Sequence, residues 1–300
     1  MSKSRELDKF YTSPKIAGEF VDKINELFPL SSYEQVIEPA AGCGNILQFL
    51  PDGAVGMDIS PENDNIIKQD FLSYVSDSSP LFGYKRISVV TNPPFGKGYM
   101  NPLAVKFFNK SAEFAELIAM IVPAVWHTSW KVQFQLDDRF GLYYSEVLPK
   151  NSFLLDGEKY DVNCCMQIYS KVPHPTIPDL RMRKRPPTKH IDFDMFLTGD
   201  NVPSRPIVQE QIRNNEYWDF AIKYWGNISI CEIEEVPVES TSHFLIKAHQ
   251  PYVRDMMEIV VKDWKKYVTA MGAPNLGGKS NLIKMYEEVK VSNLQSSTVL

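Results

Sequence analysis

The sequence lacks several features that would assign a protein to a class at once. It has four cysteines in 300 residues and no Cys-x-x-Cys pair, so it encodes neither a zinc knuckle nor a disulfide framework. Its longest apolar run, residues 117–126, is ten residues long and contains Pro123, too short for a membrane span. Residues 1–9 are polar and offer no apolar core for a signal peptide. We expect an intracellular, cytoplasmic and soluble protein with free thiols and no metal site.

The chain also lacks an excess of positive charge. Lysine and arginine number 32 against 37 acidic residues, giving a net charge of -5. This excludes a uniformly basic coat, so any nucleic-acid contact must come from a local patch. At 44% hydrophobic residues, the chain has enough apolar material for about two domains on the usual scale of ~150 residues each.

Apolar strand-like segments and amphipathic helical segments alternate through the first 171 residues. This alternation predicts an α/β fold with a doubly wound, mostly parallel sheet. The expected helices cover 14–28, 46–50 and 102–114, and the expected strands 35–39, 54–59, 65–71, 87–91, 117–122, 152–155 and 163–170.

After Val172 the pattern changes. Five prolines surround a basic cluster and interrupt regular structure. Beyond them we expect a smaller α+β region with strands near 191–195, 228–230 and 244–246 and a helix over 253–268. The sequence therefore predicts two domains, residues 1–171 and residues 172–300.

A glycine turn follows the first predicted strand of the sheet. Glu38 ends that strand, Gly42 and Gly44 form the turn, and Asp58 stands at the tip of the next strand. Such a turn lets a ligand approach the backbone, and the acid is placed to accept ribose hydroxyls. Leu47 occupies the position of a third glycine, which argues against a pyrophosphate cofactor. The pattern favours a nucleoside cofactor without phosphates.

The tetrapeptide Asn92-Pro93-Pro94-Phe95 follows another apolar strand. The prolines remove two N–H donors and fix carbonyl groups, while the Asn92 amide offers an acceptor oxygen. Such a group can accept hydrogen bonds from an amine, and Phe95 can stack on a planar ring. A Pro-Pro turn that merely ends a strand is the alternative interpretation.

Taken together in chain order, these motifs resemble the S-adenosylmethionine-dependent N6-adenine DNA methyltransferases, a Rossmann-like class I family of amino-methyltransferases. The resemblance covers roughly residues 8–171. The residues that carry it are Asp8 to Pro14, Val36 to Gly44, Gly56 to Ile59, Gln69 to Phe71 and Asn92 to Phe95.

The resemblance implies roles for these residues. Asn92 and the Pro93 carbonyl would accept the hydrogens of the adenine N6 amine, with Pro94 and Phe95 completing the catalytic motif. Phe153 is a candidate second aromatic wall, and a core strand phenylalanine is the alternative interpretation. Asp70 and Phe71 would hold the cofactor's adenine. The remaining residues expected to bind S-adenosyl-L-methionine are Tyr11, Thr12, Glu38, Pro39, Ala40, Gly42, Gly44, Asp58 and Ile59.

The substrate stays open among three alternatives: adenine in DNA, with or without a restriction partner, adenine in RNA, or a glutamine side-chain amide of a protein. A nucleic-acid partner is favoured by the basic cluster, in which Arg181, Arg183, Lys184 and Arg185 are the candidate phosphate contacts. A solvated loop is the alternative interpretation of this cluster. Single-strand or duplex preference, target sequence and oligomeric state are not encoded in any motif.

Overall fold

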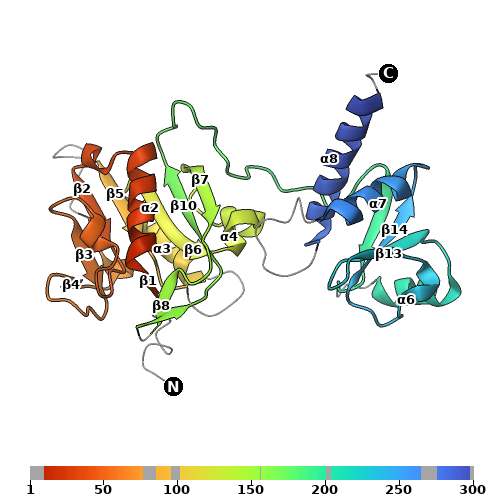
Figure 1. The fold of residues 1–300 in the computed structure, drawn as a ribbon, viewed down its shortest axis with the longest axis horizontal. Coiled ribbons are helices and arrows are strands. Elements are labelled where there is room, and N and C mark those ends of the chain that lie inside the picture. Colours follow the sequence, from red (N-terminus) through yellow and green to blue (C-terminus); the bar gives the residue numbers. More distant parts are fainter. Residues whose placement is uncertain are drawn as a thin grey trace. The chain divides into compact units, whose positions relative to one another are not determined.

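The computed structural model describes residues 10–76, 86–95, 102–155, 157–200, 204–264 and 276–297. The chain folds into two compact units, residues 1–184 and residues 185–300 (Figure 1). The division lies later than the predicted boundary after Lys171, because residues up to Arg183 bond to the first unit.

A seven-stranded mixed sheet forms the centre of unit 1, in the order β4-β3-β2-β5-β6-β10-β7. Its first five strands are parallel, whereas β10 is antiparallel to both β6 and β7. This is the mostly parallel α/β sheet that the alternating pattern predicts. The strands are β2 (Gln35–Glu38), β3 (Val55–Asp58), β4 (Ile67–Lys68), β5 (Ile87–Thr91), β6 (Leu117–Pro123), β7 (Gly141–Val147) and β10 (Cys164–Ser170).

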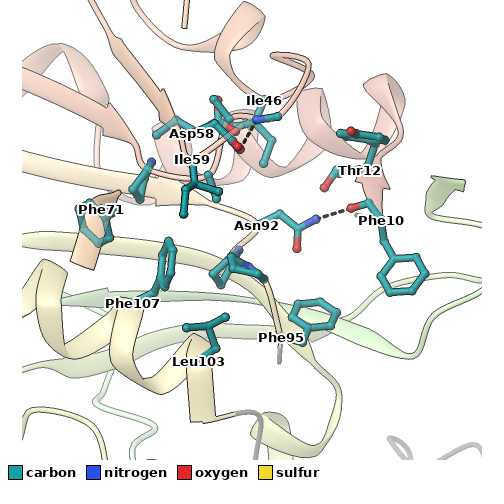
Figure 2. A pocket seen from close by; sticks show the side chains of 18 of the residues that line it. Phe10, Thr12, Ile46, Asp58, Ile59, Phe71, Asn92, Phe95, Leu103 and Phe107 are labelled. Carbon is teal, nitrogen blue, oxygen red and sulfur yellow. Dashed lines mark hydrogen bonds between the residues drawn. The ribbon is translucent and has the colours of Figure 1, made fainter. Parts of the chain in front are cut away.

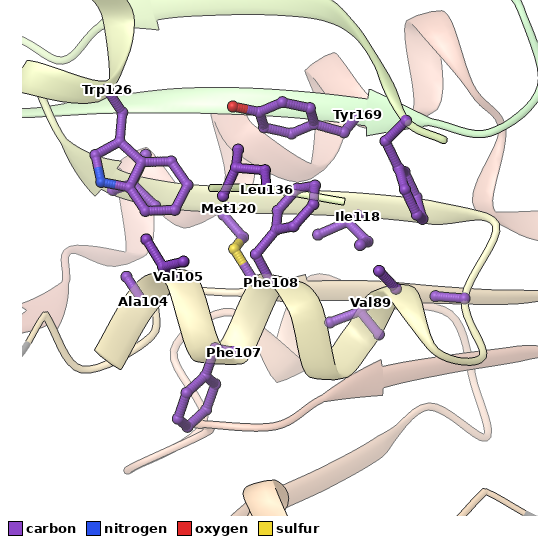
Figure 3. Close-up of a cluster of buried hydrophobic side chains, with 14 of the residues drawn as sticks. Val89, Ala104, Val105, Phe107, Phe108, Ile118, Met120, Trp126, Leu136 and Tyr169 are labelled. Carbon is purple, nitrogen blue, oxygen red and sulfur yellow. The ribbon is translucent and has the colours of Figure 1, made fainter. Parts of the chain in front are cut away.

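Helices cover both faces of this sheet because its central strands are apolar on both sides. Neighbouring residues of β5 enter different cores: Val89 packs with helix α3 (Pro102–Ala112), and Val90 packs with helix α2 (Pro14–Leu27). Figure 3 shows the α3 side, where Phe108 points into the cluster and Phe107 leaves the helix on the opposite side. The short helices α4 (Val125–Thr128) and α5 (Trp130–Gln133) extend the α3 side.

A second, three-stranded antiparallel sheet has the order β1-β8-β9, formed by β1 (Tyr11–Thr12), β8 (Phe153–Leu155) and β9 (Glu158–Tyr160). Two expectations are wrong here. Residues 152–155 belong to this small sheet and not to the central one. Residues 46–50 form only a single 3₁₀ turn, Leu47–Phe49, because Pro51 follows and ends the segment.

Unit 2 contains a four-stranded antiparallel sheet in the order β11-β14-β12-β13. Helices α7 and α8 cover one face and α6 covers the other. The strands are β11 (Phe193–Leu197), β12 (Phe220–Lys223), β13 (Ser229–Cys231) and β14 (His243–Ala248), and the helices α6 (Arg205–Asn214), α7 (Val253–Asp263) and α8 (Lys279–Ser297). Within the described ranges, no helix has the length and apolar character needed to cross a bilayer.

Candidate functional site

A cavity of about 390 Å³ opens in unit 1 where the order of the parallel strands reverses (Figure 2). From β2 the chain passes to β3 on one side, and from β5 it passes to β6 on the other, so the connections that follow these two neighbouring strands lead to opposite sides. Ligands of doubly wound sheets bind at this switch point. Three polar residues reach the cavity from strand ends: Glu38 is the last residue of β2, Asp58 is the last of β3, and Asn92 directly follows β5.

The glycine turn is fixed to the end of β3 through Asp58. The Gly42 backbone N–H donates to Asp58 Oδ2 at 2.8 Å, and the Ser60 N–H donates to Oδ1 at 2.8 Å. Gly42 has a φ of +54°, and a Cβ at this position would lie 2.8 Å from Cε1 of Tyr11. Only glycine therefore fits under the Tyr11 ring, which makes one wall of the cavity.

Glu38 is a buried carboxyl group in the cavity wall, 2% exposed. Its Oε2 atom has no hydrogen-bond partner among the described residues. Burial raises the pKa of Glu38 to about 8, the backbone N–H of Leu47 lowers it in part, and the neighbouring Asp58 raises it further. Oε2 is thus an acceptor without a donor among the described residues, and a cationic ligand would stabilise the charged form of the carboxyl group.

The Asn92 amide is oriented by the backbone of the N-terminal segment. Its Nδ2 donates to the Phe10 carbonyl at 3.0 Å, as Figure 2 shows. Its Oδ1 is buried and has no partner in the described part of the chain. Asn92 therefore presents a desolvated acceptor oxygen beside Pro93, Pro94 and Phe95, which also line the cavity.

Aromatic rings close the other side of the cavity. Phe71 packs against Phe107 of α3, with ring centroids 5.2 Å apart, and both line the cavity. Asp70 caps the 3₁₀ turn that carries Phe71, since its Oδ1 accepts from the Leu72 N–H at 2.9 Å. The flat rings beside a carboxylate can enclose a heteroaromatic base that carries an amino group.

The cavity brings together nearly all the residues expected to bind cofactor or act in catalysis. Gly44 is the exception: it does not line the cavity, and its φ of +94° serves the turn itself. Sequence reasoning did not assign eight further lining residues. Three of them, Phe10, Ala41 and Gln69, lie inside the motifs, and the others have no sequence signal that separates lining from core. The eight are Phe10, Ala41, Asn45, Ile46, Gln69, Leu72, Leu103 and Phe107.

Phe153 does not line the cavity. Its side chain is 0% exposed and packs in the core on the α2 side of the sheet. Its backbone pairs with Thr12, so it supports β1 from behind. The expectation that Phe153 contacts a substrate base is therefore wrong, because no surface of its ring remains available.

Two of the four basic residues predicted to contact phosphate, Arg181 and Arg183, form hydrogen bonds within unit 1. Arg181 is 7% exposed. Its guanidinium donates to the Phe140, Gln133 and Leu136 carbonyls at 2.8, 2.7 and 2.6 Å, and also to that of Asp137. The prediction is wrong for Arg181, whose hydrogen-bonding capacity is occupied by these backbone carbonyls.

Arg183 is also engaged within unit 1. It pairs with Asp179 at 2.8 Å and donates to the Phe140 carbonyl at 3.0 Å. Arg183, Lys184 and Arg185 are exposed, so Arg181 is the one of the four predicted residues that is buried.

No family model and no curated protein matches the chain. Among solved structures, the likeness covers about half of this chain. A protein of Pyrococcus horikoshii described as a "putative RNA methyltransferase" is 16% identical, with 56% of this chain and 88% of that chain covered and a TM-score of 0.42. A protein of Thermoplasma acidophilum is 16% identical over 54% and 90%, with a TM-score of 0.37. A "putative hemolysin" of Lactococcus lactis is 12% identical over 53% and 88%, with a TM-score of 0.35. These likenesses identify neither a family nor a substrate.

Proposed function

We propose that this protein is a Rossmann-like class I methyltransferase that transfers a methyl group from S-adenosyl-L-methionine to the N6 amine of adenine in DNA. The observation that carries the proposal is the Asn92 amide, whose oxygen is buried, unpartnered among the described residues and oriented by the bond to the Phe10 carbonyl. An isolated buried acceptor costs free energy unless a ligand donor satisfies it. An exocyclic amine is such a donor.

The charge of the cavity supports a cationic cofactor without phosphates. Its described lining contains the carboxyl groups of Glu38, Asp58 and Asp70 and no lysine, arginine or histidine. A polyphosphate would meet carboxyl groups and no cationic side chain there, whereas carboxylates would attract a sulfonium and an ammonium group. S-adenosyl-L-methionine supplies an activated methyl group on such a sulfonium.

The lining residues fit the parts of this cofactor. Asp58, at the end of β3, would accept the ribose hydroxyls, and Phe71 and Asp70 would hold the adenine; all three line the cavity. Tyr11 and Thr12 of β1 cover the opposite end, where Thr12 Oγ1 is buried and lacks a partner among the described residues. The glycine turn lets the ligand lie against the backbone between these groups.

The chain's own residues then favour transfer by position and electrostatics. Asn92 Oδ1 and the Pro93 carbonyl would accept the two hydrogens of the amine and so localise its lone pair, while Phe95 holds the ring. No covalent bond to the enzyme is required. A duplex target must be flipped out of the stack to reach this site. Residues 185–300 are assigned to target recognition, because every described lining residue belongs to unit 1.

Methyl transfer from labelled cofactor to duplex DNA, single-stranded DNA, RNA and protein tests this proposal. We expect label in the N6-methyladenine fraction of DNA. Asn92→Ala should abolish that label, while calorimetry shows cofactor affinity unchanged. Label only in RNA, or only on glutamine amides, would reassign the substrate, and full activity of Asn92→Ala would overturn the catalytic assignment.

A further inference from the structure

The orientation of the Asn92 amide depends on a contact outside its own strand. The oxygen and the NH₂ group of an asparagine amide have nearly the same size, so a half-turn of the amide exchanges them. A turned Asn92 would present its own N–H groups to the substrate amine and could not accept the hydrogens of that amine. The bond from Asn92 Nδ2 to the Phe10 carbonyl, 3.0 Å long, selects the productive orientation.

The Phe10 carbonyl is held in place by the small sheet. The Phe10 ring stacks on Tyr160, with centroids 5.3 Å apart and planes 7° apart. Tyr160 ends β9 and pairs with Phe153 of β8, which in turn pairs with Thr12 of β1. An unbroken series of contacts therefore links Tyr160 to Asn92: the stack of Tyr160 on Phe10, the backbone of Phe10 and the hydrogen bond from Asn92 to the Phe10 carbonyl.

Tyr160 itself lies outside the cavity. It is not among the residues that line it, and 37% of its side chain is exposed. Its ring stacks on Phe10, whereas the carboxyl groups of Glu38 and Asp58 stand on β2 and β3 of the central sheet. Loss of the Tyr160 ring should therefore loosen Phe10 without removing any group that is assigned to the cofactor.

We propose that Tyr160 is a positioning residue for Asn92: by stacking on Phe10 it holds the carbonyl that keeps the Asn92 oxygen toward the substrate amine. The inference rests on the proposed function, in which Asn92 is the acceptor. Tyr160 thus acts on turnover through the backbone next to β1 and touches neither cofactor nor substrate.

The full-length chain tests this with Tyr160→Ala and, as a matched control that keeps the ring, Tyr160→Phe. We expect Tyr160→Ala to lower kcat about three- to tenfold, the effect of one net hydrogen bond, with cofactor affinity unchanged by calorimetry. Tyr160→Phe should retain wild-type kcat. A loss of cofactor affinity at unchanged kcat would overturn the proposal, as would wild-type kcat in Tyr160→Ala.

A spectroscopic readout separates the two proposals. In protein labelled with ¹⁵N-asparagine, the Asn92 side-chain signal is assigned by its absence in Asn92→Asp. Tyr160→Ala should shift this signal and speed its hydrogen exchange, and Tyr160→Phe should not. An unmoved signal in Tyr160→Ala would overturn the positioning role. If the wild-type chain methylates no adenine and Tyr160→Ala still shifts the Asn92 signal, the proposed function alone is overturned.

Discussion

At the scale of single residues, Gly42 combines a backbone requirement with a packing requirement. Its φ is +54°, and an added Cβ would lie 2.8 Å from Tyr11 Cε1. Gly42→Ala should weaken cofactor binding about tenfold, because Tyr11, which makes one wall of the cavity, must move to admit the methyl group. The left-handed backbone should in addition cost folding stability about 1–2 kcal/mol. Calorimetric titration with the cofactor measures the change.

Gly53→Ala is the matched control for that substitution. Gly53 also has a positive φ, +85°, but no described atom lies within 4 Å of the place a Cβ would take, and the residue does not line the cavity. The variant should lose stability from the same backbone strain and keep its affinity. Equal losses of affinity in the two variants would show that the contact with Tyr11 is unimportant.

Glu38 makes ligand binding depend on pH. Its folded-state pKa, about 8, lies above its ordinary value of 4.5, so between these values the folded chain holds a proton that the unfolded chain releases. Stability should therefore fall as pH rises from about 4.5 to about 8. A cationic ligand favours the carboxylate, so binding near pH 7 should release a proton and tighten as the pH approaches 8.

Calorimetry in buffers of different ionisation enthalpy measures the released protons directly. Glu38→Gln should abolish the part of the release that comes from this carboxyl, and should flatten the fall of stability with pH. Proton release that is the same in Glu38→Gln and in the wild type would assign the linkage to the ligand or to another group.

At the scale of elements, Arg181 ties the end of unit 1 to the segment between α5 and β7. Its guanidinium bonds to carbonyls of Gln133, Leu136, Asp137 and Phe140. Arg181→Leu leaves the Gln133 and Leu136 carbonyls without these donors, whereas the Phe140 carbonyl keeps its bond from Arg183, and should destabilise unit 1 by about 3 kcal/mol. Thermal unfolding measures this loss. Lys184→Leu, at an exposed neighbouring site, serves as control and should leave the transition in place.

The strands of the central sheet were predictable where their apolar runs are continuous, as at 87–91 and 117–122. Strand β7 was missed because Ser145 and Glu146 interrupt its apolar pattern and it lies at the edge of the sheet. The partner of β8 could not be predicted, since an apolar triplet does not specify which strand it joins. Helix α6 was missed because only Val208 and Ile212 of its ten residues are buried.

The candidate site was predictable to the extent that it follows strand ends. Glu38, Asp58 and Asn92 each end or follow a strand, and parallel strands bring their carboxyl ends together. Arg181 shows the opposite case: its four acceptors lie more than forty residues earlier in the chain. A run of positive charges in the sequence does not reveal which of them the backbone will occupy.

At the scale of the whole molecule, the proposed function assigns ligand binding to unit 1 and target recognition to unit 2. Every described residue that lines the cavity lies between Phe10 and Phe107, within unit 1. A chain ending at Lys184 should therefore bind cofactor as the full chain does and lose most of its affinity for nucleic acid. Calorimetry measures the first property and fluorescence anisotropy the second. Nucleic-acid affinity that survives truncation would remove the recognition role from residues 185–300.

The shortness of β1 has a kinetic consequence. This strand pairs with β8 over two residues only and carries Tyr11, whose ring covers the glycine turn at one wall of the cavity. We expect a ligand held beneath Tyr11 to escape when this short ladder opens, so that its residence time follows the opening frequency of β1 as well as its own contacts. Product release would then be gated by Tyr11 and Thr12.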